Sequence, residues 1–141
     1  MKRFAKKTTI SFGSGCLGGL VASLAVWLAG FYGLTEGLGV TMAPAISVNW
    51  LYPRVVWGGL WGFLFVLPVF SKSIVRRGVV LSFGPTLFQL FVFYPHLAGQ
   101  GIMGLGLGAL TPLFVFVFNA VWGISTAFWV RFAGEEVGSN R

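Results

Sequence analysis

Two carboxamide side chains lie in the middle of long apolar runs. Gln89 comes 11 residues after Gly78, and Asn119 comes 12 residues before Arg131. At a helical rise of about 1.5 Å per residue, both amides are expected about 16 to 18 Å from the same edge of a bilayer core about 30 Å thick. Amides at that depth need partners. The sequence therefore predicts a hydrogen bond between Gln89 and Asn119, and the alternative is a polar site for a ligand, a quinone or a permeating species.

Three ionisable side chains, Glu36, Arg54 and His96, lie in or beside the two segments that connect apolar runs on the side of the membrane opposite to Gly78 and Arg131. They could converge on a small polar site in which Glu36 pairs with Arg54 and His96 titrates nearby. The alternative is that each residue is a separate anchor at the membrane interface. An enzyme that acts on lipid through Glu36 or His96 is a further alternative.

The residues that support most other chemistry are scarce. The chain has one cysteine, Cys16, and one histidine, His96, so it has neither a pair of thiols nor a pair of haem-ligating histidines. No His, Asp and Glu cluster is suited to a metal. The sequence therefore predicts no catalytic residue, no metal site and no cofactor. The aromatic content of 17% is typical of rings that face lipid or fill helix contacts, and a pigment or quinone groove is the alternative.

The composition excludes a soluble domain, because 141 residues that are 56% hydrophobic and only 9% charged cannot cover a globule with polar surface. We predict an all-α polytopic integral membrane protein, residues 1–141 forming a single transmembrane domain. Pro53 is expected at the first position of the second helix, Gly84-Pro85 is expected to kink the third, and Pro95 is expected to end it. The four predicted transmembrane helices cover approximately residues 11–34, 53–70, 78–94 and 108–132.

The basic residues predict the orientation of these helices. Cations gather in the N-terminal tail, in the hinge Ser71–Gly78 and at the C-terminal end, and among the ten Lys and Arg residues only Arg54 lies on the opposite side. Cytoplasmic loops of membrane proteins carry the excess of Lys and Arg. We therefore expect both termini and the hinge in the cytoplasm, in the inner (plasma) membrane. The cytoplasmic cations are Lys2, Arg3, Lys6, Lys7, Lys72, Arg76, Arg77, Arg131 and Arg141. Because they lie at the ends of apolar runs and form no basic stripe, nucleic-acid binding is excluded.

Small residues at four-residue spacing form a flat face on the first helix, at Ser11, Gly15, Gly19 and Ser23. The second helix has a similar patch that includes Gly58 and Gly62. Such faces let two helix backbones approach closely, as in glycine zippers. The partner of the first-helix face is either another helix of this chain or another subunit. The two segments on the outer side, residues 35–52 and 96–111, are rich in glycine and are predicted to be interfacial or re-entrant.

These features favour a non-catalytic function. The leading hypothesis is a structural or accessory subunit of a membrane complex, or a self-associating scaffold, that docks through glycine-rich helix faces. Its expected partners are membrane lipids and either other membrane subunits or further copies of the chain. The alternative hypothesis is a small oligomeric transporter or channel that uses the broken third helix together with Gln89 and Asn119.

Overall fold

The computed structural model describes the backbone of residues 1–139 and the side chains of residues 1–134. Arg141, one of the cations counted above, lies outside the described residues. Within them the chain is all helix and turn, with no β-strand, so the predicted all-α fold is confirmed for this range. The elements, in chain order, are α1 Lys2–Phe31, α2 Leu34–Gly37, α3 Val48–Gly62, η1 Phe63–Val66, α4 Ile74–Phe88, η2 Gln89–Leu97, η3 Ile102–Gly104 and α5 Thr111–Ser139.

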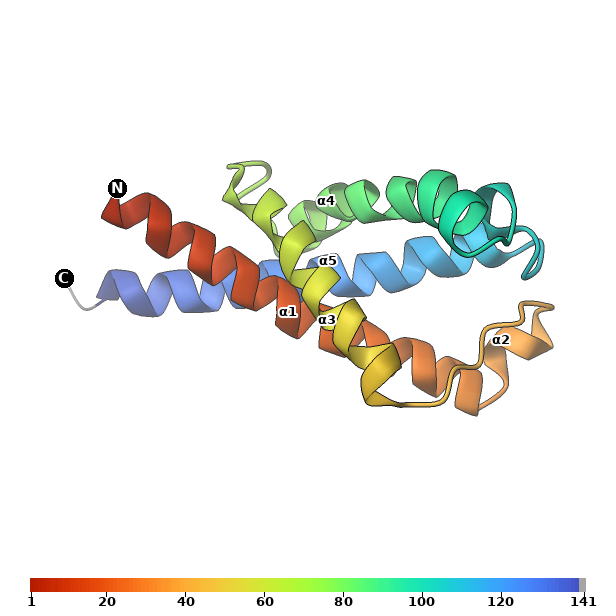
Figure 1. Cartoon of the computed structure of the whole chain (residues 1–141). Helices are drawn as coiled ribbons and strands as arrows, with labels where there is room; N and C mark the ends of the chain where they lie inside the picture. The colour runs from red at the N-terminus through yellow and green to blue at the C-terminus, as the bar shows by residue number, and fades with distance from the viewer. Residues whose placement is uncertain (140–141) are drawn as a thin grey trace.

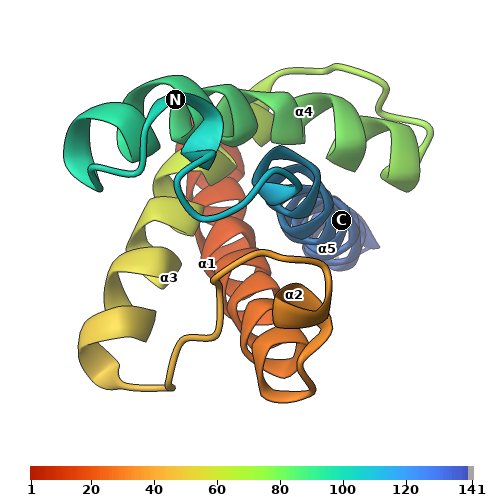
Figure 2. The ribbon, with the colours of Figure 1, turned by 90° about the vertical axis from the view of Figure 1, so that its right-hand side faces the viewer.

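The long helices run side by side, and the two ends of the bundle differ (Figure 1). The N-terminus and the described end of α5 lie together at one end, here called the terminal end. The segments 32–47 and 98–110 lie at the other end, here called the loop end. Viewed from the loop end, α3 and α5 flank α1, and α4 lies across the top (Figure 2).

Three helices in the described residues are long and apolar enough to cross a membrane: Lys2–Phe31, Ile74–Leu97 and Thr111–Gly134. They correspond to the first, third and fourth predicted transmembrane helices. α1 and α5 extend beyond the predicted limits, since α1 begins at Lys2 and α5 continues to Ser139. The element that corresponds to the second prediction, α3 with η1, is not among the three.

The second helix begins earlier than predicted. α3 starts at Val48, where the hydroxyl of Ser47 accepts a hydrogen bond of 3.2 Å from the amide of Trp50. Ser47 is therefore an N-cap that satisfies one of the free amides of the first turn. Pro53 lies inside the helix, so its predicted position as the first helical residue is wrong. The helical segment ends at Val66, because Leu67 is extended.

The third helix continues through the two residues that were expected to kink it or to break its hydrogen bonds. α4 includes Gly84 and Pro85 and runs to Phe88 without an interruption of its helical assignment. From Gln89 the chain winds as a π-helix to Leu97, and Pro95 lies inside it. The helical winding thus continues past Pro95, so the prediction that Pro95 ends the helix is wrong.

Glycine contacts bring α1 and α3 together. A Cβ atom at Gly58 would lie 2.7 Å from the Gly15 carbonyl oxygen and 3.0 Å from Gly19 Cα. A Cβ atom at Gly62 would lie 3.0 Å from Gly15 Cα and would also meet the Ser11 carbonyl. No side chain larger than hydrogen fits at these contacts. The two helix backbones therefore touch directly.

Two further interfaces complete the bundle. On the next face of α1, a Cβ atom at Gly18 would lie 2.8 Å from the Trp122 carbonyl oxygen of α5. Between α4 and α5, a Cβ atom at Gly78 would lie 2.6 Å from the carbonyl carbon of Gly123. α1 therefore packs on both α3 and α5, and α4 packs on α5. α3 and α4 share no comparable interface in the described structure, which leaves room between them.

Hydrogen bonds close both ends of this bundle. At the loop end the amide of Thr41 donates to the Leu107 carbonyl at 2.9 Å, so the two glycine-rich segments are joined. Near the terminal end, Arg77 donates to the carbonyl oxygen of Leu67 at 3.1 Å and Arg131 donates to that of Lys72 at 2.9 Å. Arg77 and Arg131, two of the cations expected in the cytoplasm, thus stabilise the turn that connects η1 to α4.

Candidate functional site

A cavity of about 730 Å³ lies between α3 and the α4–η2 helix. α1 and α5 contribute its inner wall, and the segment 41–44 closes part of it at the loop end. This volume is within the range of about 300–1,000 Å³ that is typical of small-molecule sites. The cavity follows from the packing described above, since direct backbone contacts at glycines join α3 to α1 and α4 to α5, whereas Gly84 of α4 meets only the side chains of Trp61 and Leu64.

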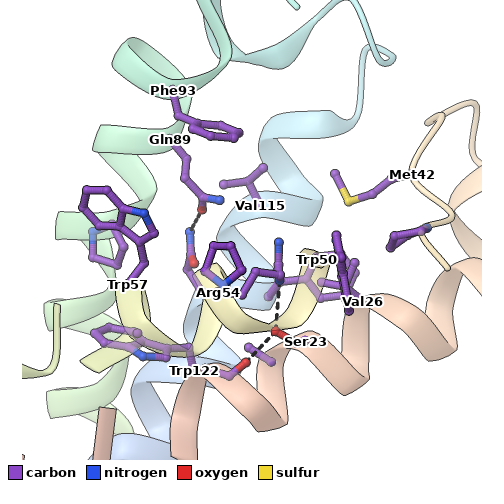
Figure 3. Close-up of a pocket in the computed structure, with 18 of the residues that line it drawn as sticks. Ser23, Val26, Met42, Trp50, Arg54, Trp57, Gln89, Phe93, Val115 and Trp122 are labelled. Carbon is purple, nitrogen blue, oxygen red and sulfur yellow. Dashed lines mark hydrogen bonds between the residues drawn. The ribbon is translucent and has the colours of Figure 1, made fainter. Parts of the chain in front are cut away.

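A single cation projects into this cavity (Figure 3). Arg54, on α3, donates from Nε to the hydroxyl of Ser23 on α1 at 2.9 Å. Ser23 is fully buried and donates in turn to the Gly19 carbonyl at 2.7 Å. The guanidinium carbon lies 4.9 Å from the centre of the Trp50 ring, in a cation–π contact. These contacts on two sides hold the guanidinium in one place.

The terminal nitrogens of Arg54 have no hydrogen-bond acceptor among the described residues. The only hydrogen bond of this side chain is the one from Nε. Both terminal nitrogens are accessible rather than buried. Because Arg54 lines the cavity, their donors are available there. The cavity therefore contains a fixed positive charge with free donors.

Two amides form a polar group in the cavity wall. Asn119 Nδ2, on α5, donates to Gln89 Oε1 at 2.6 Å, which is the hydrogen bond drawn at Gln89 in Figure 3. Asn119 Nδ2 also donates to Thr86 Oγ1 at 3.2 Å. The structure thus brings together the two amides that the sequence placed at the same depth. Gln89 is also the first residue of the π-helix. The change in helix winding begins where α4 faces the cavity.

The rest of the wall is mainly aromatic and aliphatic. Trp57 and Trp61 of α3 both lie against Phe88 of α4, with ring centres 5.7 Å apart in each pair. They are the principal side-chain contacts across the gap between α3 and α4. Phe93 and Leu97 line the cavity from η2 and remain 39% and 67% exposed, and Trp57 is 50% exposed. The exposed lining is therefore apolar at these three residues, whereas Thr41 and Asn49 contribute exposed polar side chains.

Glu36 and His96 lie outside the cavity. Glu36 is exposed on α2 and His96 is exposed on η2, and neither lines the cavity. No ion pair or hydrogen bond joins either side chain to Arg54 within the described residues. Of the three outer ionisable residues that the sequence singled out, only Arg54 belongs to the site.

The small residues singled out for helix packing lie at contacts inside the chain. Ser11, Gly15, Gly19 and Ser23 are all buried on α1, and the α3 residues that face them include Gly58 and Gly62. Ser23 combines two roles, since it packs in this row and also holds Arg54. The second role was not predicted, because Ser23 and Arg54 are separated by 31 positions and become neighbours only through the packing of α1 on α3.

The lining of the cavity contains groups that can recognise a ligand. Among the described residues, no group of three or more His, Cys, Asp and Glu side chains is suited to a metal. A fixed guanidinium, a mid-wall amide pair and aromatic walls can bind a molecule that has one polar or anionic end and one apolar end. Comparison of the chain with protein-family models, with curated proteins and with solved structures finds no match.

Proposed function

We propose that the chain crosses a plasma membrane four times, with both termini in the cytoplasm. Three helices are long and apolar enough to cross. An odd number of crossings would put the termini on opposite sides, whereas they lie at the same end of the bundle (Figure 1). α3 with η1 supplies the fourth crossing as a short, tilted helix. The cations of the terminal end favour the cytoplasm for that end.

The function we propose is the binding of an amphipathic molecule within the membrane, in the manner of a small carrier. The cavity between α3 and α4–η2 is the observation that carries this proposal. The apolar part of its exposed lining, formed by Trp57, Phe93 and Leu97, suits contact with lipid better than contact with water. A molecule that is already dissolved in the bilayer would then reach the cavity by lateral diffusion between the two helices.

The native tryptophans provide a test. Trp50, Trp57, Trp61 and Trp122 line the cavity, whereas Trp27 and Trp129 do not. After Trp27 and Trp129 are changed to Phe, a bromine-labelled fatty acid is added to the protein in nanodiscs. A bound probe would quench the remaining fluorescence saturably. Quenching that rises only in proportion to the probe in the bilayer would contradict the proposal.

A role as an accessory subunit is the second candidate function, and a specific observation bears on where a partner would bind. The glycine-rich faces of α1 and α3 are used within the chain. A partner subunit would therefore pack on other surfaces, such as the outer face of α1, where Leu17, Leu24 and Leu28 are exposed. Mass determination of the particle, extracted gently from native membranes, would reveal other polypeptides or further copies in a fixed ratio.

A further inference from the structure

We infer that Arg54 is an oxyanion receptor that binds the carboxylate or phosphate head of an amphiphile, whose apolar chain occupies the aromatic part of the cavity. This inference rests on the proposed binding function. It adds the charge of the ligand and its orientation in the site.

The first argument is the state of the guanidinium. An arginine side chain has five N–H donors and stays charged in proteins. Arg54 uses Nε to hold Ser23, and the donors of its two terminal nitrogens have no acceptor among the described residues. Both nitrogens are accessible, so they are free to donate to an anion that enters the cavity.

The second argument is that the described chain offers Arg54 no counter-charge. The protein has three acidic residues, Glu36, Glu135 and Glu136. Glu36 is exposed on α2 and does not line the cavity. Glu135 and Glu136 follow Gly134 in the last part of α5, whereas the α5 residues of the cavity lie between Val115 and Trp122. Among the described side chains, no carboxylate therefore pairs with Arg54.

The third argument is the geometry of presentation. Ser23 holds the Nε side of the guanidinium at 2.9 Å, and Trp50 covers one of its faces at 4.9 Å. The edge that carries the two terminal nitrogens is left facing the cavity (Figure 3). Two parallel N–H groups in a fixed plane match the two oxygens of a carboxylate or a phosphate. The arginine is thus oriented before the ligand arrives.

The remaining cavity indicates that the anion carries an apolar chain. A free inorganic anion would occupy only a small part of about 730 Å³ and would leave the cavity beside Trp57, Phe88 and Phe93 unfilled. An acyl chain or another apolar group would fill this space and contact these rings. Gln89 and Asn119 are uncharged and are bonded to each other at 2.6 Å, so Arg54 is the charged group that an anionic head would contact.

The test compares two probes of equal chain length in the fluorescence assay above, a bromine-labelled fatty acid in its ionised form and its methyl ester. The wild-type protein should bind the acid at least about tenfold more tightly than the ester, as expected for charge-assisted hydrogen bonds. Arg54→Gln should abolish this preference by weakening acid binding. Arg54→Lys should keep part of it. Arg76→Gln is the matched control, because Arg76 is exposed at the start of α4 and lies outside the cavity.

Each other outcome contradicts a specific part of the inference. Equal affinity for acid and ester in the wild type, which needs no variant, would overturn the role of Arg54 while leaving a binding cavity. An unchanged preference in Arg54→Gln would do the same. Saturable binding of neither probe would instead reject the proposed function. Competition by inorganic phosphate or acetate would show that the ligand is a free anion, and it would overturn the inference that the ligand carries an apolar chain. Competition by lysophosphatidic acid alone would show that the site also accepts phosphate heads.

Discussion

At the scale of single residues, the site combines one cation with one pair of amides. Arg54 is held by Ser23 and Trp50 on the cavity wall, and its free donors are its most informative feature. Asn119 donates a hydrogen bond to Gln89 at 2.6 Å. In an apolar setting the free donors of Arg54 attract a ligand, whereas the hydrogen bond between the two amides stabilises the packing of α4 against α5.

The amide pair leads to a prediction about stability. Gln89→Leu and Asn119→Leu should each lower the free energy of unfolding by roughly 0.5–2 kcal/mol, because each removes the hydrogen bond between the amides. Asn119 keeps Thr86 as an acceptor in Gln89→Leu, so Asn119→Leu should have the larger effect. Replacing both should cost less than the sum of the two single changes. Denaturant unfolding in detergent micelles measures all three variants. Strict additivity would show that the hydrogen bond contributes nothing to stability.

At the scale of helices, glycine contacts decide which pairs pack closely. α1 meets α3 through Gly15, Gly19, Gly58 and Gly62, and α4 meets α5 through Gly78. Across the gap, side chains make the contacts between α3 and α4, such as Trp57 with Phe88 and Trp61 with Gly84. The cavity therefore lies where the two helices lack direct backbone contact.

A matched pair of substitutions on α1 tests this account. Gly15→Ala would place a methyl group against the Gly58 carbonyl and 2.8 Å from Gly62 Cα, whereas a Cβ atom at Gly13 has no neighbour within 4 Å. Gly15→Ala should therefore destabilise the protein by roughly 1–3 kcal/mol. Gly13→Ala should be neutral or stabilise it by roughly 0.5–1 kcal/mol, because alanine favours the helix. Equal effects at both positions, measured by thermal unfolding, would contradict the close packing of α1 on α3.

At the scale of the whole molecule, the proposed topology places the basic turn and both termini on one side of the membrane. Arg77 and Arg131 bind the carbonyls of this turn, so some of the charges that favour the cytoplasm also stabilise the structure there. The glycine-rich segments at the other end are joined through Thr41 and Leu107. Each end of the bundle is thus stabilised by its own hydrogen bonds.

Cysteine labelling tests this topology. In a Cys16→Ala background, Ser71→Cys and Leu105→Cys each place one thiol at an exposed position, near the terminal end and at the loop end respectively. An impermeant maleimide should label Leu105→Cys on intact cells and should label Ser71→Cys only after the membrane is opened. Labelling of both positions from outside would reject four crossings with cytoplasmic termini, and so would the reverse pattern.

The sequence predicted the features that depend on local pattern or on depth along a helix. The all-α class follows from composition, and the shared depth of Gln89 and Asn119 follows from counting residues between charged edges. The start of α3 was missed because Ser47 caps the helix ahead of Pro53. The π-helix was missed because a proline such as Pro95 usually ends a helix. The partnership of Ser23 with Arg54 depends on tertiary packing, which no local pattern encodes.

The most direct test of the central claim is the small-molecule content of the protein after gentle extraction from native membranes, measured by native mass spectrometry. The account predicts that wild-type protein and Arg76→Gln retain an amphiphile with an acidic head, and that Arg54→Gln loses it. Equal retention in all three proteins would contradict the role of Arg54. Wild-type protein that retains no amphiphile would contradict the cavity as a binding site.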